Sequence, residues 1–346
     1  MSYPQAATGP VLYDFRSDTV TRPGAAMRAA MAAAEVGDDV WGDDPTVLRL
    51  QAVAAEMLGY EAGLFVPSGT QSNLIGLLAH CQRGDEYLVG QDAHTYKYEG
   101  GGAAVLGSIQ PQPIENAADG TIPLEKLKKA LKPDDAHFAR TRLLALENTT
   151  GGKVLPTDYV RAATDWAHGA GLATHLDGAR LFNAAVARQV APAEIARGFD
   201  SVSICLSKGL GAPVGSVLLG SHVLIAQGKR WRKMLGGGMR QAGILAAAGL
   251  YALDRHIDRL ADDHANASRL ADGLSRLPGL TVESQTNMVF VQVAAEHAAD
   301  FAAYLATQGL LVSSVGSAQR WVTHLDVDTV AVDAALAIAA RFFDGR

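Results

Sequence analysis

The sequence predicts an α/β fold, with a larger domain built on a mostly parallel sheet and a smaller C-terminal α+β domain. Three observations lead to this prediction. Over residues 56–217, short apolar runs alternate with helical stretches, the pattern of βαβ units whose sheet is covered on both faces. Residues 242–274 are rich in alanine and leucine and predict a long helix. After Pro278-Gly279 the pattern changes to a shorter alternation of strands and helices.

The individual elements follow from these patterns. In the larger domain the expected strands are 63–66, 86–89, 143–146, 172–176, 201–205 and 216–219, and the clearest helices are 71–81, 124–131 and 157–170. In the smaller domain we expect strands over 281–293, 310–315 and 320–325, and helices over 297–307 and 332–343. A boundary near residue 250, within the long helix, divides the chain into domains of 14–250 and 251–346.

Composition excludes several classes of function. The formal net charge is -6, which argues against nucleic acid as a partner. One basic cluster is either a solvated helix face or a contact for a phosphate or a subunit; it consists of Lys229, Arg230, Arg232 and Lys233. The only cysteines, Cys81 and Cys205, form neither a disulfide framework nor a CxxC metal pair, so we expect two small core residues and no metal site.

The N-terminus and the hydropathy pattern bear on location. Residues 1–10 lack a basic start and an apolar segment, so they do not resemble a signal peptide. No uninterrupted apolar stretch is long enough to span a bilayer. The expectation is a cytoplasmic protein.

Lys208 follows the buried run that ends at Leu206. A lysine at the end of a buried strand suits Schiff-base chemistry, because desolvation lowers the pKa of an ammonium group and frees the amine. Taken alone, it is more often an ordinary loop lysine. The glycine-rich stretch 209–215 is not a dinucleotide motif, because Pro213 interrupts any helix that would start there.

Asp177 ends the apolar run 172–176, at the sheet edge where α/β proteins bind ligands. A carboxylate there would keep the ring nitrogen of pyridoxal 5′-phosphate (PLP) protonated, as that cofactor requires to act as an electron sink. The alternative is a helix cap or turn residue. One βαβ unit separates Asp177 from Lys208, which predicts neighbouring strand ends.

Two further signals lie at strand ends of the same sheet. Gly69 and Thr70 open a helix, where backbone N–H groups and a hydroxyl suit an anion, although an ordinary N-cap explains them equally well. His94 follows the run 86–90, and its flat ring suits stacking on a flat cofactor, although a lone histidine is more often structural. Each signal is weak alone, but four of them at one sheet edge indicate a PLP site.

With these motifs the chain resembles the low-specificity L-threonine aldolases, PLP enzymes of the aspartate-aminotransferase-like fold. The resemblance covers nearly the whole chain, from about Asp14 to Asp328. The matching stretches include Arg16-Ser17-Asp18-Thr19-Val20-Thr21-Arg22-Pro23, Gly42-Asp43-Asp44-Pro45-Thr46, Pro67-Ser68-Gly69-Thr70-Gln71, His175-Leu176-Asp177-Gly178-Ala179-Arg180, Cys205-Leu206-Ser207-Lys208-Gly209-Leu210-Gly211 and Gly236-Gly237-Gly238-Met239-Arg240-Gln241.

The resemblance implies the roles of the site residues. Lys208 would carry PLP as a Schiff base, Asp177 would hold its ring nitrogen, and His94 would stack on its ring. Gly69, Thr70 and Arg240 would hold the phosphate. The substrate is an amino acid, whose carboxylate Ser17, Arg180 and Arg320 would bind, with His137 near its hydroxyl. Trp41 stands where many relatives have tyrosine, which puts any role of that hydroxyl in doubt.

The resemblance also implies a homotetramer, a dimer of dimers with shared active sites, and reversible cleavage of L-threonine and L-allo-threonine to glycine and an aldehyde. The general base is His94, His137 or a water that they hold. Fold alone does not fix the reaction, so an aminotransferase or a β-eliminating lyase is the alternative. Serine hydroxymethyltransferase-like chemistry lacks a convincing folate site. A catalytically silent binding protein would need neither Lys208 nor Asp177.

Overall fold

The computed structural model describes residues 10–344. Their contacts divide them into two compact units, a larger one of 23–207 and 212–254 and a smaller one of 10–22, 208–211 and 255–344. This division differs from the predicted domains of 14–250 and 251–346 at the N-terminus, because β1 (Tyr13–Asp14) pairs with β11 (Leu310–Leu311). The expectation that residues 1–10 do not form a signal peptide concerns residues that, except for Pro10, lie outside the described part of the chain.

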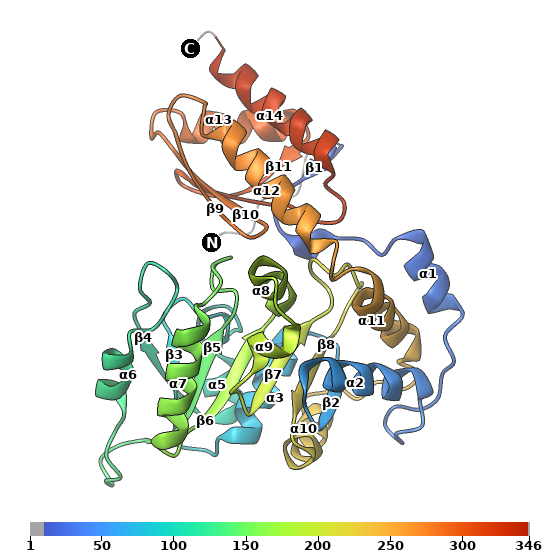
Figure 1. Cartoon of the computed structure of the whole chain (residues 1–346), viewed down its shortest axis with the longest axis vertical. Coiled ribbons are helices and arrows are strands. Elements are labelled where there is room, and N and C mark those ends of the chain that lie inside the picture. The colour runs from blue at the N-terminus through green and yellow to red at the C-terminus, as the bar shows by residue number, and fades with distance from the viewer. Residues whose placement is uncertain (1–9, 345–346) are drawn as a thin grey trace. The chain divides into compact units, whose positions relative to one another are not determined.

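A seven-stranded sheet is the centre of the larger unit (Figure 1). Its strand order is β2 (Ala62–Val66), β8 (Ser216–Gly220), β7 (Ser201–Cys205), β6 (Ala173–Gly178), β5 (Arg140–Glu147), β3 (Asp85–Gly90) and β4 (Gln110–Ile114). Only β8 runs antiparallel to its neighbours, so the prediction of a mostly parallel sheet is confirmed. The C-terminal ends of the other six strands therefore lie at one edge.

Helices cover both faces of this sheet (Figure 1). α3 (Gly69–His80) and α10 (His222–Met234) pack on each other and on β2 and β8, where Leu64, Ile75 and Leu218 share one apolar cluster. α7 (Thr157–Gly169) packs on β5 and β6. The other helices of this unit are α1 (Ala25–Ala32), α2 (Pro45–Leu58), α4 (His94–Lys97), α5 (Gly102–Gly107), α6 (Leu124–Ala130), α8 (Leu181–Arg188), α9 (Pro192–Ala196) and α11 (Gly243–Arg255).

The smaller unit is α+β, as predicted. Its antiparallel sheet has the order β12 (Ser313–Val315), β13 (Ala318–Val322), β10 (Met288–Val293) and β9 (Leu280–Gln285). Its helices are α12 (Leu260–Leu274), α13 (Ala298–Thr307) and α14 (Thr329–Phe343), with a short 3-10 helix, η1, at Asp18–Val20. Phe15, Phe301 and Trp321 are fully buried in its core.

Several predicted elements need correction. The long helix 242–274 is two helices, α11 and α12, separated by a turn at 256–259. The strand 281–293 is a hairpin, because the chain turns at Thr286, whose φ is 52°. The run 310–315 contributes to two different sheets, and the strand expected at 320–325 is β13. Strand β4 was missed because it contains Pro111 and Pro113, which are tolerated where it pairs with β3 at the sheet edge.

Within residues 10–344, no helix combines the length and the apolar character needed to cross a membrane.

We predict that Gly76→Ala destabilises the fold. A Cβ at Gly76 in α3 would lie 2.7 Å from Cε1 and 2.9 Å from Nδ1 of the buried His175 in β6, so helix and strand would have to separate. Overpacking of this kind costs about 1–3 kcal/mol. Urea unfolding measures the change. Gly169→Ala, at the end of α7, is the matched control because an added Cβ there meets nothing within 4 Å. Equal stabilities of the two variants would contradict this account of α3 packing.

Candidate functional site

The C-terminal edge of the large sheet carries a buried carboxylate, Asp177, at the end of β6. Its side chain is 3% exposed. Oδ2 accepts a hydrogen bond from Asn73 Nδ2 (2.9 Å), and Oδ1 accepts one from the backbone N–H of Ala179 (3.0 Å). In the described part of the chain, no lysine or arginine forms an ion pair with Asp177. A buried carboxylate with only neutral donors fits a cationic ligand atom.

His94 lies next to Asp177 at this edge, as the first residue of α4 after β3. Its Nδ1 is 2.9 Å from Oε1 of Glu99, whose side chain is 4% exposed. The same Oε1 accepts a second hydrogen bond from Asn73 Nδ2 (2.9 Å). Burial raises the pKa of Glu99, while the hydrogen bond to His94 lowers it. The Glu99 carboxylate therefore orients the His94 ring, which is about half exposed.

His94, Glu99 and Asp177 also satisfy the spacing of a metal site, with ligand atoms within 4.8 Å of one another. The hydrogen bonds to Asn73 and between His94 and Glu99 already give each of the three a partner. The absence of a metal stays a prediction.

The anion-binding turn lies at the start of α3. The helix begins at Gly69, two residues before the start we predicted, and Ser68 is its N-cap, with Oγ accepting from the N–H of Gln71 (3.2 Å). The first turn of a helix has N–H groups without intrahelical partners. Within the described residues the N–H groups of Gly69 and Thr70 have no hydrogen-bond acceptor, which suits a phosphate.

Trp41 and Arg240 lie in two loops that contact each other. Arg240 Nη1 is 2.9 Å from Asp38 Oδ2, and its carbonyl accepts from the N–H of Asp39 (3.0 Å). Trp41 follows in the same turn and is 81% exposed. Both loops thus stay at the surface, available to a neighbouring subunit or a ligand.

Two buried acidic residues hold the loop of Trp41 in place. Asp39 pairs with Arg232 Nη1 (2.7 Å), which also donates to the carbonyl of Phe65 in β2 (2.8 Å). Asp44 accepts from four backbone N–H groups, those of Thr46, Val47, Gly37 and Gly243. The Gly-Asp-Asp-Pro-Thr motif is therefore structural here, because its second Asp caps α2 and joins three segments.

Lys208, Ser17 and Arg320 belong to the smaller unit. Lys208 follows β7 and is half buried; its carbonyl accepts from Thr21 Oγ1 (3.0 Å) and from the N–H of Gly211 (2.8 Å). Arg320 Nη2 donates to the carbonyl of Arg16 (3.2 Å), which precedes Ser17. The structure thus brings Arg320 and Ser17 together from opposite ends of the sequence.

Arg180 and His137 differ in position. Arg180 is the N-cap residue of α8, at the same sheet edge as Asp177. His137 lies before the start of β5, at the opposite edge; the strand has eight residues and spans about 26 Å. Its side chain is 87% exposed and contacts Asp135 (2.6 Å). Within one chain His137 therefore lies far from Asp177. The expectation that it lies near the substrate hydroxyl stays a prediction, which requires a neighbouring subunit to bring it to the site.

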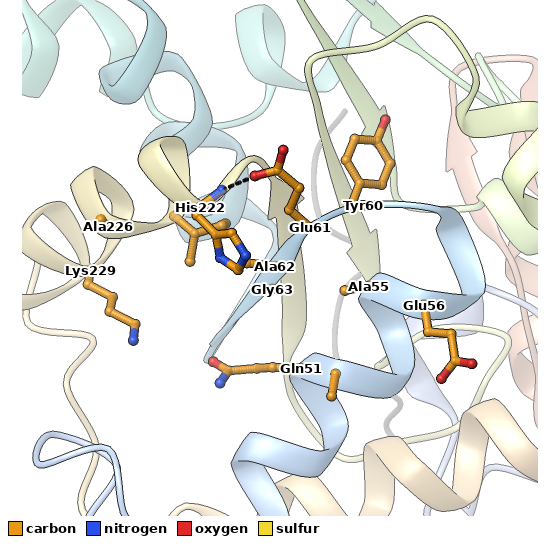
Figure 2. A pocket seen from close by; sticks show the side chains of 12 residues that line it. Gln51, Ala55, Glu56, Tyr60, Glu61, Ala62, Gly63, His222, Ala226 and Lys229 are labelled. Carbon is orange, nitrogen blue, oxygen red and sulfur yellow. Dashed lines mark hydrogen bonds between the residues drawn. The ribbon is translucent and has the colours of Figure 1, made fainter.

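A hollow of about 490 Å³ lies elsewhere, between α2, β2 and α10 (Figure 2). Glu56, Glu61, His222 and Lys229 are among the residues that line it, and none of the predicted site residues does. Glu61 Oε2 accepts from the N–H of His222 (2.8 Å), which ties β2 to the start of α10.

The sequence analysis missed Asn73 and Glu99. Asn73 lies one helical turn after Gly69, and Glu99 lies five residues after His94, but neither spacing is a known signature. Their contacts arise from the packing of α3, α4 and β6 in the folded chain, which the sequence pattern does not show.

Comparison with known proteins places this geometry in a family. The model of the beta-eliminating lyase family matches residues 14–296. The chain is 56% identical to the low specificity L-threonine aldolase of Escherichia coli K12 over 316 residues, which cover 91% of this chain and 95% of that one. It is 47% identical to low-specificity L-threonine aldolase 1 of Arabidopsis thaliana, with 81% of each chain covered.

This chain is a member of the low-specificity L-threonine aldolase family. Its fold also matches the solved structure of threonine aldolase from Leishmania major, with a TM-score of 0.83, 21% identity and coverage of 96% of this chain and 99% of that one. As a threonine aldolase homologue it is a lyase, and the family is PLP-dependent.

We predict that this threonine aldolase homologue loses stability on mild acidification, partly through His80. Burial lowers the pKa of His80 to about 4 from its ordinary 6.5. Between about pH 6.5 and about pH 4, His80 is therefore protonated in the unfolded chain but neutral in the folded chain. In this window the free energy of unfolding decreases as the pH decreases, by up to about 1.4 kcal/mol per pH unit for one group.

Urea unfolding at about pH 7 and about pH 5 tests this linkage. His80→Gln should lose less stability between the two values than the wild type. His137→Gln, an exposed matched control, should lose as much as the wild type. A His80→Gln variant with the wild-type pH dependence would show that His80 is not the linked group.

Proposed function

We propose that this protein uses PLP to cleave L-threonine and L-allo-threonine, and other L-β-hydroxy-α-amino acids, reversibly to glycine and an aldehyde. The observation that carries the proposal is the buried Asp177 carboxylate, which has only neutral hydrogen-bond donors and lies beside the helix that begins at Gly69. A site with a carboxylate for a cationic ring and free helix N–H groups for a phosphate fits both ends of PLP.

We assign the residues to the cofactor as follows. Asp177 would hold the protonated ring nitrogen, His94 would stack on the ring, and Lys208 would bind the aldehyde carbon through its amine. Gly69 and Thr70 would bind the phosphate, with Arg240 beside it. When bound, PLP supplies the electron sink that accepts the pair released by Cα–Cβ cleavage.

The chain's own residues would orient the substrate. Arg180, Arg320 and Ser17 would bind its carboxylate, and guanidinium groups do so bidentately. A carboxylate held in this way would restrict rotation about the bond from nitrogen to Cα and so orient the Cα–Cβ bond for cleavage. Positioning of this kind supplies much of the rate enhancement of enzymes.

His94 is the base that this chain's geometry favours. Its Nδ1 lies against the Glu99 carboxylate, which fixes the proton on Nδ1 and leaves the lone pair on Nε2. Nε2 would then take the proton of the substrate hydroxyl, directly or through a water. His137 is the alternative, and it would act only from a neighbouring subunit, since the sheet separates it from Asp177 within one chain.

A homotetramer with shared sites completes the proposal. The support for it is the exposure of Trp41 and the position of His137 at the far edge of the sheet. Cytoplasmic location stays a prediction.

We predict that the protein releases acetaldehyde from L-threonine and L-allo-threonine and not from the two D isomers. The carboxylate, the amino nitrogen and the scissile bond of the substrate would be fixed together, and a D substrate would not satisfy all three. The two L isomers exchange a methyl and a hydroxyl group at Cβ, a packing difference of about 1–3 kcal/mol. Trapping of acetaldehyde gives kcat/KM for each of the four isomers.

Lys208→Ala is the control for this assay. It should lose nearly all turnover together with the visible absorption band of the bound cofactor. Glycine formation without acetaldehyde, a requirement for a keto acid, or cleavage of either D isomer would each contradict the proposed activity. A Lys208→Ala variant with the wild-type band and rate would remove Lys208 from its role.

A further inference from the structure

A chain of four buried or half-buried polar side chains joins α3 to β6 and β7 and ends at the proposed ring-nitrogen site. His80 Nε2 is 2.7 Å from Ser201 Oγ, and Ser201 Oγ is 2.8 Å from His175 Nδ1. His175 Nε2 is 3.2 Å from Asn73 Oδ1. Asn73 Nδ2 then contacts the carboxylates of Asp177 and Glu99, both at 2.9 Å.

The chemistry of these groups fixes the direction of every hydrogen bond. Carboxylates accept, so both N–H bonds of the Asn73 amide point at Asp177 and Glu99, and its carbonyl oxygen faces His175. An amide oxygen only accepts, so His175 carries its proton on Nε2. Burial lowers the pKa of His175 to about 3, so the ring is neutral and Nδ1 is an acceptor.

The same reasoning continues to the other end of the chain. Because His175 Nδ1 accepts, the Ser201 hydroxyl donates to it. The Ser201 oxygen is then left to accept from His80, so His80 carries its proton on Nε2. Both histidines are neutral near pH 7, because burial lowers the pKa of His80 to about 4. One arrangement of protons satisfies all four side chains.

The packing leaves these groups little room to adopt another arrangement. Asn73, His175 and Ser201 are each at most 2% exposed. An added Cβ at Gly76 would lie 2.7 Å from the His175 ring, so α3 contacts that ring closely. A buried donor or acceptor that loses its partner costs about 1–3 kcal/mol, which resists a flip of the Asn73 amide.

We infer that Asn73 is a positioning residue for both carboxylates of the site, and that His80, Ser201 and His175 lock its amide in the orientation this requires. The inference rests on the proposed function. The Asn73 amide would orient two carboxylates. One is Asp177, which would face the ring nitrogen, and the other is Glu99, which sets the position of the proton on His94. A flipped amide would turn its carbonyl oxygen toward two carboxylates and repel both.

Ser201→Ala tests the lock, because it removes the hydroxyl link and leaves every group that would touch PLP in place. Magic-angle-spinning ¹⁵N NMR of histidine-labelled holoenzyme should show His175 protonated at Nε2 in the wild type, assigned by its loss in His175→Gln. In Ser201→Ala both tautomers should appear. Titration of the Ser201→Ala apoprotein with PLP should show a dissociation constant about tenfold higher than that of the wild type.

The controls separate this role from a general loss of structure. Ser72→Ala removes a different fully buried hydroxyl, one that lies in α3 and has no hydrogen-bond partner among the described residues, and should keep the wild-type tautomer and PLP affinity. Ser201→Thr retains the hydroxyl and should restore both. Asn73→Asp, which replaces the donor by an acceptor, should weaken PLP binding more than Ser201→Ala.

The outcomes distinguish the lock from the proposed function. Wild-type tautomer and PLP affinity in Ser201→Ala, in a protein that cleaves L-threonine, would overturn the lock and leave the function standing. His175 protonated at Nδ1 in the wild type would also overturn it. The tautomer measurement does not depend on turnover, so absence of threonine cleavage would contradict the function without affecting the test of the lock.

Discussion

Close packing of α3 against β6 is the constraint on which the candidate site depends. The helix approaches the strand closely because Gly76 has no side chain where it meets His175. This approach places Asn73 against Asp177. Gly69 lies four residues earlier in the same helix, about 6 Å along its axis. One rigid helix therefore sets both the phosphate-binding turn and the amide that orients the ring-nitrogen carboxylate.

The buried acids of the larger unit show how this edge differs from the rest of the interior. Asp44 accepts four backbone N–H groups, and Asp39 pairs with Arg232. Asp44 is hydrogen-bonded and Asp39 is ion-paired within the protein, and both hold loops together. Asp177 accepts from one side-chain amide and one backbone N–H, and it has no arginine or lysine partner among the described residues. Asp177 can therefore still bind a cation, and the proposed chemistry uses this property. A positive partner stabilises the charged form of a buried carboxylate.

The sequence predicted the fold class because apolar runs and helical stretches alternate regularly, and it predicted His94 and Asp177 because each follows such a run. It did not predict β4, whose prolines disguise an edge strand, or the break between α11 and α12. Asn73 and Glu99 were missed because their roles come from packing; the bond from Asn73 to Asp177 joins residues 104 positions apart. His137 was placed by resemblance alone, and the direction of β5 shows that it lies at the other edge within one chain.

The central claim, that Asp177 holds a protonated ring nitrogen, is tested most directly by ¹⁵N NMR of the holoenzyme with PLP labelled at that nitrogen. The wild type should show the chemical shift of a protonated pyridine nitrogen near neutral pH. Asp177→Asn, which keeps the shape of the side chain and removes its charge, should show the shift of the unprotonated form. An unprotonated nitrogen in the wild type, or a protonated one in Asp177→Asn, would contradict the account.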